Sequence, residues 1–164
     1  MEGLSLDTVE EIDYEVAKRD FKFFFEDILG FQLSHHHEEW YNNLESQRRY
    51  CVKAARDHGK STLFLCYLLW KVAFNPKCKA VLISHSLHQS IHHMRTLNDL
   101  IDGIPFMARM KKPDSWSKTF FGFDNGSNIS AKSVGGAIRG IHPDLILCDD
   151  ILWGTTDTEL QRVA

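Results

Sequence analysis

Apolar residues recur at helical spacing through the first part of the chain. Between residues 7 and 29 they follow one another mostly three to five positions apart, which is typical of one face of a helix. An acid three residues after Asp7 completes a capping pattern at the start, and Gly30 ends the segment. Ser34 is the predicted cap of a second helix, which runs to about residue 46. Residues 1–47 are therefore predicted to form a helical lead-in.

Short, uninterrupted apolar runs then alternate with longer helical segments. A run without polar alternation is typical of a strand that is buried on both faces, as in a parallel sheet. The predicted strands are residues 50–54, 80–84 and 144–149, and the predicted helices are residues 60–74 and 86–101. A loop or short turn is expected at 104–113, followed by a hairpin within 120–131 that turns at Asn125-Gly126. The pattern predicts an α/β fold, with a mostly parallel sheet and helices on both faces.

Composition adds little that is specific. The chain has 164 residues, of which 43% are hydrophobic and 25% charged, as expected for one globular domain with a core of its own. The net charge of −3 means that the chain as a whole lacks the excess of basic residues that is typical of nucleic-acid-binding domains. The four cysteines lack paired metal-ligand spacing, which favours free thiols in a reducing cytoplasm. The apolar helix at 60–74 is too short to span a bilayer and contains Lys71, so no membrane association is expected.

The segment between the first predicted strand and the following helix is the most informative part of the chain. It ends in Gly59-Lys60-Ser61, and such loops cradle phosphates with backbone N–H groups and the positive end of a helix dipole. Lys60 would neutralise the β- and γ-phosphates, and the Ser61 hydroxyl would hold Mg²⁺. The usual pattern opens with glycine, and Ala54 stands in that place. The candidate nucleotide-binding residues are Ala55, Arg56, Asp57, His58, Gly59, Lys60, Ser61 and Thr62.

A second candidate site comes at the end of the last predicted strand, where two carboxylates follow an apolar run. Asp149 and Asp150 lie at the carboxyl end of that strand, which is the edge where open α/β sheets bind ligands. Asp149 would complete the Mg²⁺ shell, directly or through water, and Asp150 would orient or deprotonate the attacking water. Alternatively, the two residues only end the strand and cap the next segment. Most ATPases of this kind carry Glu at the second position, and Asp150 is shorter by one methylene.

With both sites placed, the layout resembles the ATPase domain of the large terminase subunit of tailed bacteriophages, the motors that package DNA into preformed heads. The similarity covers most of residues 35–150. The segments that match in order are residues 37–40, 55–62, 82–86 and 139–150. The Arg139-Gly140 lead-in to an Asp-Asp strand, paired with Arg56 inside the phosphate loop, is more specific than either motif alone. The resemblance implies a P-loop NTPase fold of the ASCE type.

The resemblance also implies roles for two arginines. Arg56 would contact phosphate oxygens, because a guanidinium can fork onto two of them where lysine cannot. Arg139 would act as a finger that reaches a neighbouring subunit's ATP and stabilises transition-state charge. Alternatively, Arg139 is structural and ties the loop before the last strand to the sheet.

Two residues of the second predicted helix lie where the family places its adenine-contacting segment. Trp40 would stack near the base, and His37 would read the adenine edge. Alternatively, Trp40 belongs to the core and His37 is a surface histidine.

The resemblance also implies cofactors, partners and a place of action. ATP and Mg²⁺ would be the cofactors, and hydrolysis would drive double-stranded DNA into the procapsid. The implied partners are the DNA, the portal protein, the small terminase subunit and further copies in a homo-oligomeric ring, in the host cytoplasm and transiently on the procapsid portal. Residues 1–164 would be a single ATPase domain whose nucleotide-binding core, residues 48–164, is incomplete at its C-terminus, and the family's nuclease domain would be absent.

Two other functions remain open from the residues themselves. A helicase-like DNA translocase has a related core, although Arg139-Gly140 favours the terminase. A non-catalytic nucleotide-binding or assembly module would share the phosphate loop but hydrolyse little ATP.

Overall fold

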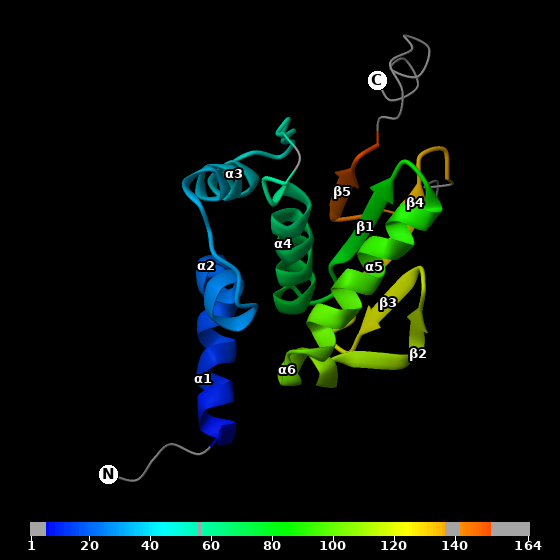
Figure 1. The fold of residues 1–164 in the computed structure, drawn as a ribbon. Helices are drawn as coiled ribbons and strands as arrows, with labels where there is room; N and C mark the ends of the chain where they lie inside the picture. Colours follow the sequence, from blue (N-terminus) through cyan, green and yellow to red (C-terminus); the bar gives the residue numbers. More distant parts are fainter. Residues whose placement is uncertain (1–5, 56, 137–141, 152–164) are drawn as a thin grey trace. The chain divides into compact units, whose positions relative to one another are not determined.

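The computed structural model describes residues 6–55, 57–136 and 142–151, and the side chains from residue 10 onward. The chain divides into two compact units, Met1–Trp70 and Lys71–Ala164. The first unit is helical, and the second is built on a β-sheet (Figure 1).

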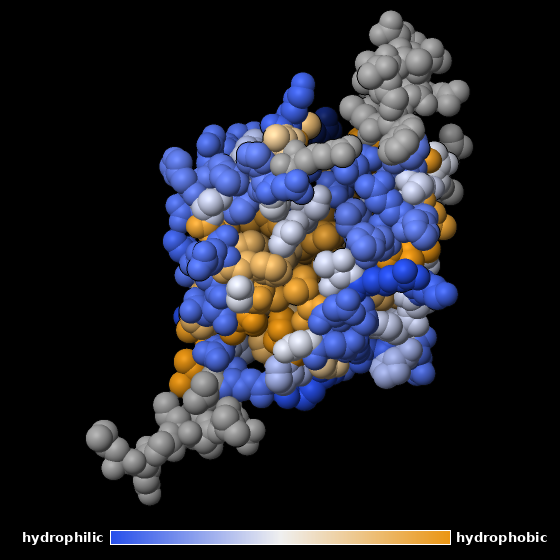
Figure 2. All heavy atoms as spheres, in the orientation of Figure 1, coloured by the Kyte–Doolittle hydropathy of each residue, from blue (hydrophilic) through white to orange (hydrophobic). Residues whose placement is uncertain are grey.

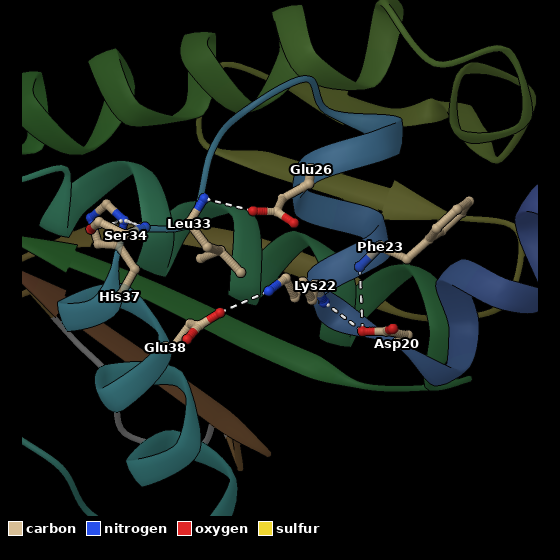
Figure 3. A network of polar contacts seen from close by, with 8 residues as sticks. All are labelled: Asp20, Lys22, Phe23, Glu26, Leu33, Ser34, His37 and Glu38. Atoms are coloured by element: carbon tan, nitrogen blue, oxygen red, sulfur yellow. Dashed lines mark hydrogen bonds and ion pairs between the residues drawn. The ribbon is translucent and has the colours of Figure 1, made fainter.

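The first unit opens with three consecutive helical elements where one long helix was predicted. These are α1 at Leu6–Arg19, the single turn α2 at Phe21–Phe23, and the π-helix η1 at Phe24–Ile28. The break comes at Asp20, which has extended backbone angles and whose side chain accepts hydrogen bonds from the N–H groups of Lys22 and Phe23 (Figure 3). The prediction of one uninterrupted helix is therefore wrong, because an aspartate side chain competes with the helix for backbone donors.

The other helices of this unit agree with the sequence pattern. Helix α3 spans His35–Ser46 with Ser34 as its N-cap, and α4 spans Lys60–Phe74, so that its residues from Lys71 onward belong to the second unit. Gly30, at φ +74°, follows η1, as expected for a residue that ends a helix. Figure 3 shows Lys22 of α2 paired with Glu38 of α3 at 2.8 Å, although both side chains are largely exposed and the pair contributes little to stability.

An aromatic cluster forms the core of the first unit. Phe21 is fully buried, and its ring centroid lies 4.8 Å from that of Tyr41, 5.6 Å from Tyr67 and 5.5 Å from Trp70. The Trp70 indole N–H donates to the backbone carbonyl of Ala17 at 2.7 Å, so this buried polar group is satisfied. The cluster ties α1, α2, α3 and α4 together around one side chain.

The strand predicted just before the phosphate loop is wrong for this structure. Residues 51–55 have no regular secondary structure. A strand requires backbone hydrogen bonds to a neighbouring strand. Among the residues that the structure describes, residues 51–55 pair with no other strand.

The second unit contains a five-stranded sheet in the order β2-β3-β4-β1-β5. Its strands are β1 at Lys79–Ser84, β2 at Lys111–Ser117, β3 at Phe120–Phe123, β4 at Asn128–Ser133 and β5 at Leu145–Asp149. β1 pairs in parallel with β4 and β5, whereas β2–β3 and β3–β4 are antiparallel. The sheet is thus mixed, and the prediction of a mostly parallel sheet is wrong, because short turns join β2, β3 and β4 in sequence.

The predicted hairpin is confirmed, and the segment before it was misread. β3 and β4 pair around Asn125-Gly126, where Gly126 has φ +82° and the side-chain carbonyl of Asn125 accepts from the N–H of Ser127. The predicted loop at 104–113 instead holds α6 at Pro105–Arg109 and the start of β2. Pro113 lies inside β2, which is tolerated because β2 is an edge strand and a missing N–H there breaks no interior ladder.

β5 is the other edge strand of the described sheet, and it is less buried than predicted. It was predicted to be buried on both faces, but Ile146 is 50% exposed and only Asp149 is buried. The exposed residues Ile146 and Cys148 alternate with partly buried ones, so one face of β5 is open to solvent within the described structure.

Helix α5 at Leu87–Asp102 packs on β1 and β4 (Figure 1). Its buried face consists of Ser90, His93, Met94, Leu97 and Ile101. Its outward face is hydrophilic in Figure 2, as expected for an amphipathic helix on a sheet. Across the described residues, no helix is long and apolar enough to cross a membrane.

Candidate functional site

The candidate phosphate loop has the backbone of a tight turn into a helix. Asp57 has φ +64° and Gly59 has φ +68°, and α4 begins at the next residue, Lys60. The N–H of Leu63 bonds the Gly59 carbonyl at 2.9 Å, which makes the loop's last carbonyl the start of the helical ladder. The N–H groups of the first turn of a helix are left for other partners, and they carry the positive end of its dipole.

The loop residues differ in their exposure. Ala55, Asp57 and His58 are exposed, whereas Gly59, Lys60, Ser61 and Thr62 are half-buried. Arg56 lies outside the described residues, so its predicted phosphate contact stays a prediction. The glycine–lysine–serine part of the predicted loop therefore lies at the helix start, as the sequence pattern requires.

His37 of α3 braces this loop. Its Nε2 lies 2.8 Å from the backbone carbonyl oxygen of His58, and its Nδ1 lies 3.2 Å from the backbone N of Ser34 (Figure 3 shows the Ser34 contact). Since the Ser34 N–H donates to Nδ1, the matching tautomer carries its hydrogen on Nε2 and donates it to His58. His37 is only 9% exposed, so the alternative of a surface histidine is wrong. Both ring nitrogens are engaged within the protein, which favours a role in holding the loop over direct contact with adenine.

Trp40 lies beside His37 in a group of neighbouring rings. Its ring centroid lies 4.9 Å from His36, 5.5 Å from His37 and 6.3 Å from Phe64 at the start of α4. Trp40 is half-buried, so one part of the ring packs and another part faces solvent. Its predicted adenine contact stays a prediction.

Gly59 is required by the close approach of His37. A Cβ at position 59 would lie 3.0 Å from His37 Cε1 and only 2.8 Å from His37 Nε2, and the second distance is closer than real Cβ atoms come to other atoms. The positive φ of Gly59 adds a second penalty for any other residue. The sequence showed the glycine, but the histidine that excludes a side chain there was not predicted as its partner.

We expect Gly59→Ala to destabilise the first unit through two separable costs. The left-handed backbone alone costs an L-residue roughly 1–2 kcal/mol, and the contact with His37 adds to it. In a His37→Ala background the contact is gone and only the backbone cost remains. The matched control is Gly30→Ala, because Gly30 has φ +74° but a Cβ added there would meet nothing within 4 Å. Urea unfolding measures the loss in the free energy of unfolding. An equal loss for Gly59→Ala in both backgrounds would contradict the role of the His37 contact.

The acidic pair lies at the carboxyl end of β5. Asp149 is 3% exposed and stands opposite Ser84, the last residue of β1, in the parallel register. Asp150 is exposed and has φ +47°, a left-handed conformation that aspartate tolerates better than most residues. The two neighbours therefore face different surroundings, one inside the unit and one in solvent.

Two side chains of α5 reach this acidic pair. His93 Nε2 lies 3.1 Å from Asp149 Oδ2, and Gln89 Nε2 lies 3.5 Å from Asp150 Oδ2. Neither residue was predicted as part of the site. The available signal was that His93 falls at a core position of an amphipathic helix, among Met94 and Leu97.

The candidate phosphate loop belongs to the first unit and the acidic pair to the second. Their combination into one site, with Ser61 and Asp149 on one metal, stays a prediction. Arg139 lies outside the described residues, and so does its predicted role as a finger.

Comparison with known proteins adds one relative. Over 111 residues the chain is 26% identical to the large terminase subunit of Enterobacteria phage T3. The chain is similar to a phage terminase large subunit. The match covers 63% of this chain and 19% of the relative, so the chain spans about a fifth of that protein's length. No protein-family model matches the chain.

Proposed function

We propose that this chain is the ATP-binding part of a phage terminase motor, in which ATP hydrolysis moves double-stranded DNA into the procapsid. The observation that carries the proposal is the turn at Gly59, which opens directly onto Lys60 and a 15-residue helix. The similarity to a terminase large subunit supports the same proposal.

The helix that follows the loop and the cations near it support the proposal of triphosphate binding. Helix α4 is 15 residues long, and the N–H groups of its first turn carry the positive end of its dipole, which favours an anion at this place. Lys60 would bind the β- and γ-phosphates from the first helical position. Arg56 would add a second cation, and Trp40 would lie against the base.

The acidic pair suits a hard cation. Asp149 offers a buried carboxylate, and the buried Ser84 hydroxyl beside it in the register has no hydrogen-bond partner in the part of the chain that the structure describes. Mg²⁺ prefers such oxygen ligands and takes one or two carboxylates together with substrate phosphates. Ser61 and Asp149 would hold the ion, which supplies neutralisation of phosphate charge. Asp150 would orient or deprotonate the attacking water, and Arg139 would reach a neighbouring subunit's ATP.

The remaining partners follow from the same proposal. The DNA, the portal protein, the small terminase subunit and further copies in a ring would assemble with this chain in the host cell. The competing functions are a helicase-like translocase with the same core and a nucleotide-binding module without catalysis.

Steady-state ATP hydrolysis by the chain, alone and with DNA, tests the proposal. We expect hydrolysis that double-stranded DNA stimulates, and we expect Asp150→Asn to abolish hydrolysis while leaving Mg²⁺-dependent ATP binding intact. The matched control is Asp124→Asn, an exposed carboxylate in the β3–β4 turn, which should change neither quantity.

Other outcomes separate the alternatives. Stimulation by single-stranded DNA only would favour the helicase-like translocase. ATP binding without hydrolysis in any condition would indicate the non-catalytic module, and the absence of ATP binding would overturn the proposal.

A further inference from the structure

Helix α5 meets the acidic pair with polar side chains from its first two turns. Ser90 Oγ donates to the Lys132 carbonyl at 2.6 Å, which attaches the helix to the end of β4. Gln89 lies next to Asp150, and His93 lies next to Asp149. The helix therefore contacts the carboxyl ends of two strands, on either side of β1, at the edge where the proposed metal would bind.

His93 is an unusual residue for its position. It is 8% exposed, and the buried face of the same helix is otherwise apolar at Met94, Leu97 and Ile101, with Ser90 as its other polar residue. A leucine would fill such a position without bringing a polar ring into the interior, where a polar group is costly unless it is hydrogen-bonded. Within the described residues, the polar group that its Nε2 approaches is the Asp149 carboxylate.

His93 Nε2 and Asp149 Oδ2 lie close together, but their geometry is not that of a hydrogen bond. The 3.1 Å separation is an ion-pair distance, yet Nε2 makes no hydrogen bond of good geometry within the described residues. Contacts in catalytic sites are often poorly aligned without ligand and tighten when it binds. A small rotation of either side chain would turn this approach into an N–H···O bond.

We infer that His93 is a positioning residue that holds the Asp149 carboxylate in the orientation in which it binds the metal. The inference rests on the proposed function and names a residue for that site. A carboxylate that is only 3% exposed takes its orientation from the groups packed around it, which include His93 from α5 and Ser84 from β1. Partners behind a metal ligand orient it and tune its affinity, and their loss costs roughly 10- to 100-fold in metal binding.

The test measures Mg²⁺ affinity rather than turnover. A fluorescent ATP analogue is bound to the full chain at fixed concentration, and Mg²⁺ is titrated against the signal for wild type, His93→Leu and His93→Gln. His93→Leu should raise the Mg²⁺ concentration at half-saturation by roughly 10- to 100-fold, with unchanged nucleotide affinity in EDTA. His93→Gln should restore most of the affinity, because its amide N–H can reach the place of Nε2. Packing alone would not produce this rescue.

Two controls keep the outcome decisive. His92→Leu removes the adjacent histidine, which is exposed, and should leave the Mg²⁺ dependence as in wild type. If His93→Leu does not fold by circular dichroism, His93→Asn replaces it, because the shorter amide stays polar but falls short of Oδ2.

The proposed function and this inference fail in different ways. If wild type binds the analogue without any Mg²⁺ dependence, the proposed function fails. If wild type depends on Mg²⁺ and a folded His93→Leu or His93→Asn has the same dependence, the positioning role is overturned.

Discussion

We expect Lys60→Ala to remove most of the nucleotide affinity that we propose for the chain. Lys60 is the first residue of α4 and follows a glycine at φ +68°, so its side chain leaves the backbone at the helix start, where we propose that the phosphates bind. A hydrogen bond to a charged group contributes roughly 1.5–3 kcal/mol, which corresponds to a loss of about 10- to 100-fold in affinity. Equilibrium binding of a fluorescent ATP analogue in the presence of Mg²⁺ measures the effect.

The matched control for this experiment is Lys53→Ala. Lys53 is exposed and precedes the loop, so its substitution removes the same charge from the same region without touching the helix start. Equal affinities for Lys60→Ala and wild type would contradict the phosphate-binding role of the loop. Equal losses in both variants would indicate a general effect of positive charge.

Phe21→Ala causes the largest loss of stability that we expect in the first unit. The Phe21 ring is fully buried and contacts Tyr41, Tyr67 and Trp70, so its removal leaves a cavity at the junction of four helices. Substitutions of this kind cost about 3–5 kcal/mol because the surrounding structure relaxes only in part. Urea unfolding followed by tryptophan fluorescence measures the change, since Trp70 belongs to the cluster.

Phe120→Ala is the control for loss of an aromatic side chain. Phe120 is 37% exposed at the start of β3, so its removal opens no enclosed cavity and should cost far less. A loss of stability for Phe21→Ala no greater than that for Phe120→Ala would show that the aromatic cluster is not the core of the first unit.

Local patterns predicted most of the elements well. The starts and ends of α3, α4 and α5 agree with the sequence within a residue or two, because caps and apolar periodicity act over a few neighbouring residues. The β3–β4 hairpin was found for the same reason, since Asn125-Gly126 specifies the turn by itself.

The wrong predictions about the sheet share a physical cause. A strand forms only where a neighbouring strand provides hydrogen-bond partners for its backbone. Residues 51–55 are apolar enough for a strand but have no ladder in the described structure, whereas β2 contains Pro113 and still pairs with β3. The mixed character of the sheet likewise depends on which strands lie side by side. The break of the first helix at Asp20 was the exception, since its cause is local and was visible in the sequence.

The sequence by itself determined the candidate functional groups. These are the Gly59-Lys60-Ser61 turn before a helix and the two carboxylates at the end of β5. These signals are contained in short segments, where residue type and spacing decide the local backbone. Only the tertiary structure decided which side chains serve them, namely His37 against the phosphate loop and His93 against Asp149. Both histidines act across long separations in the chain, and such contacts arise from the packing of one helix on a loop or a sheet, which no local pattern specifies.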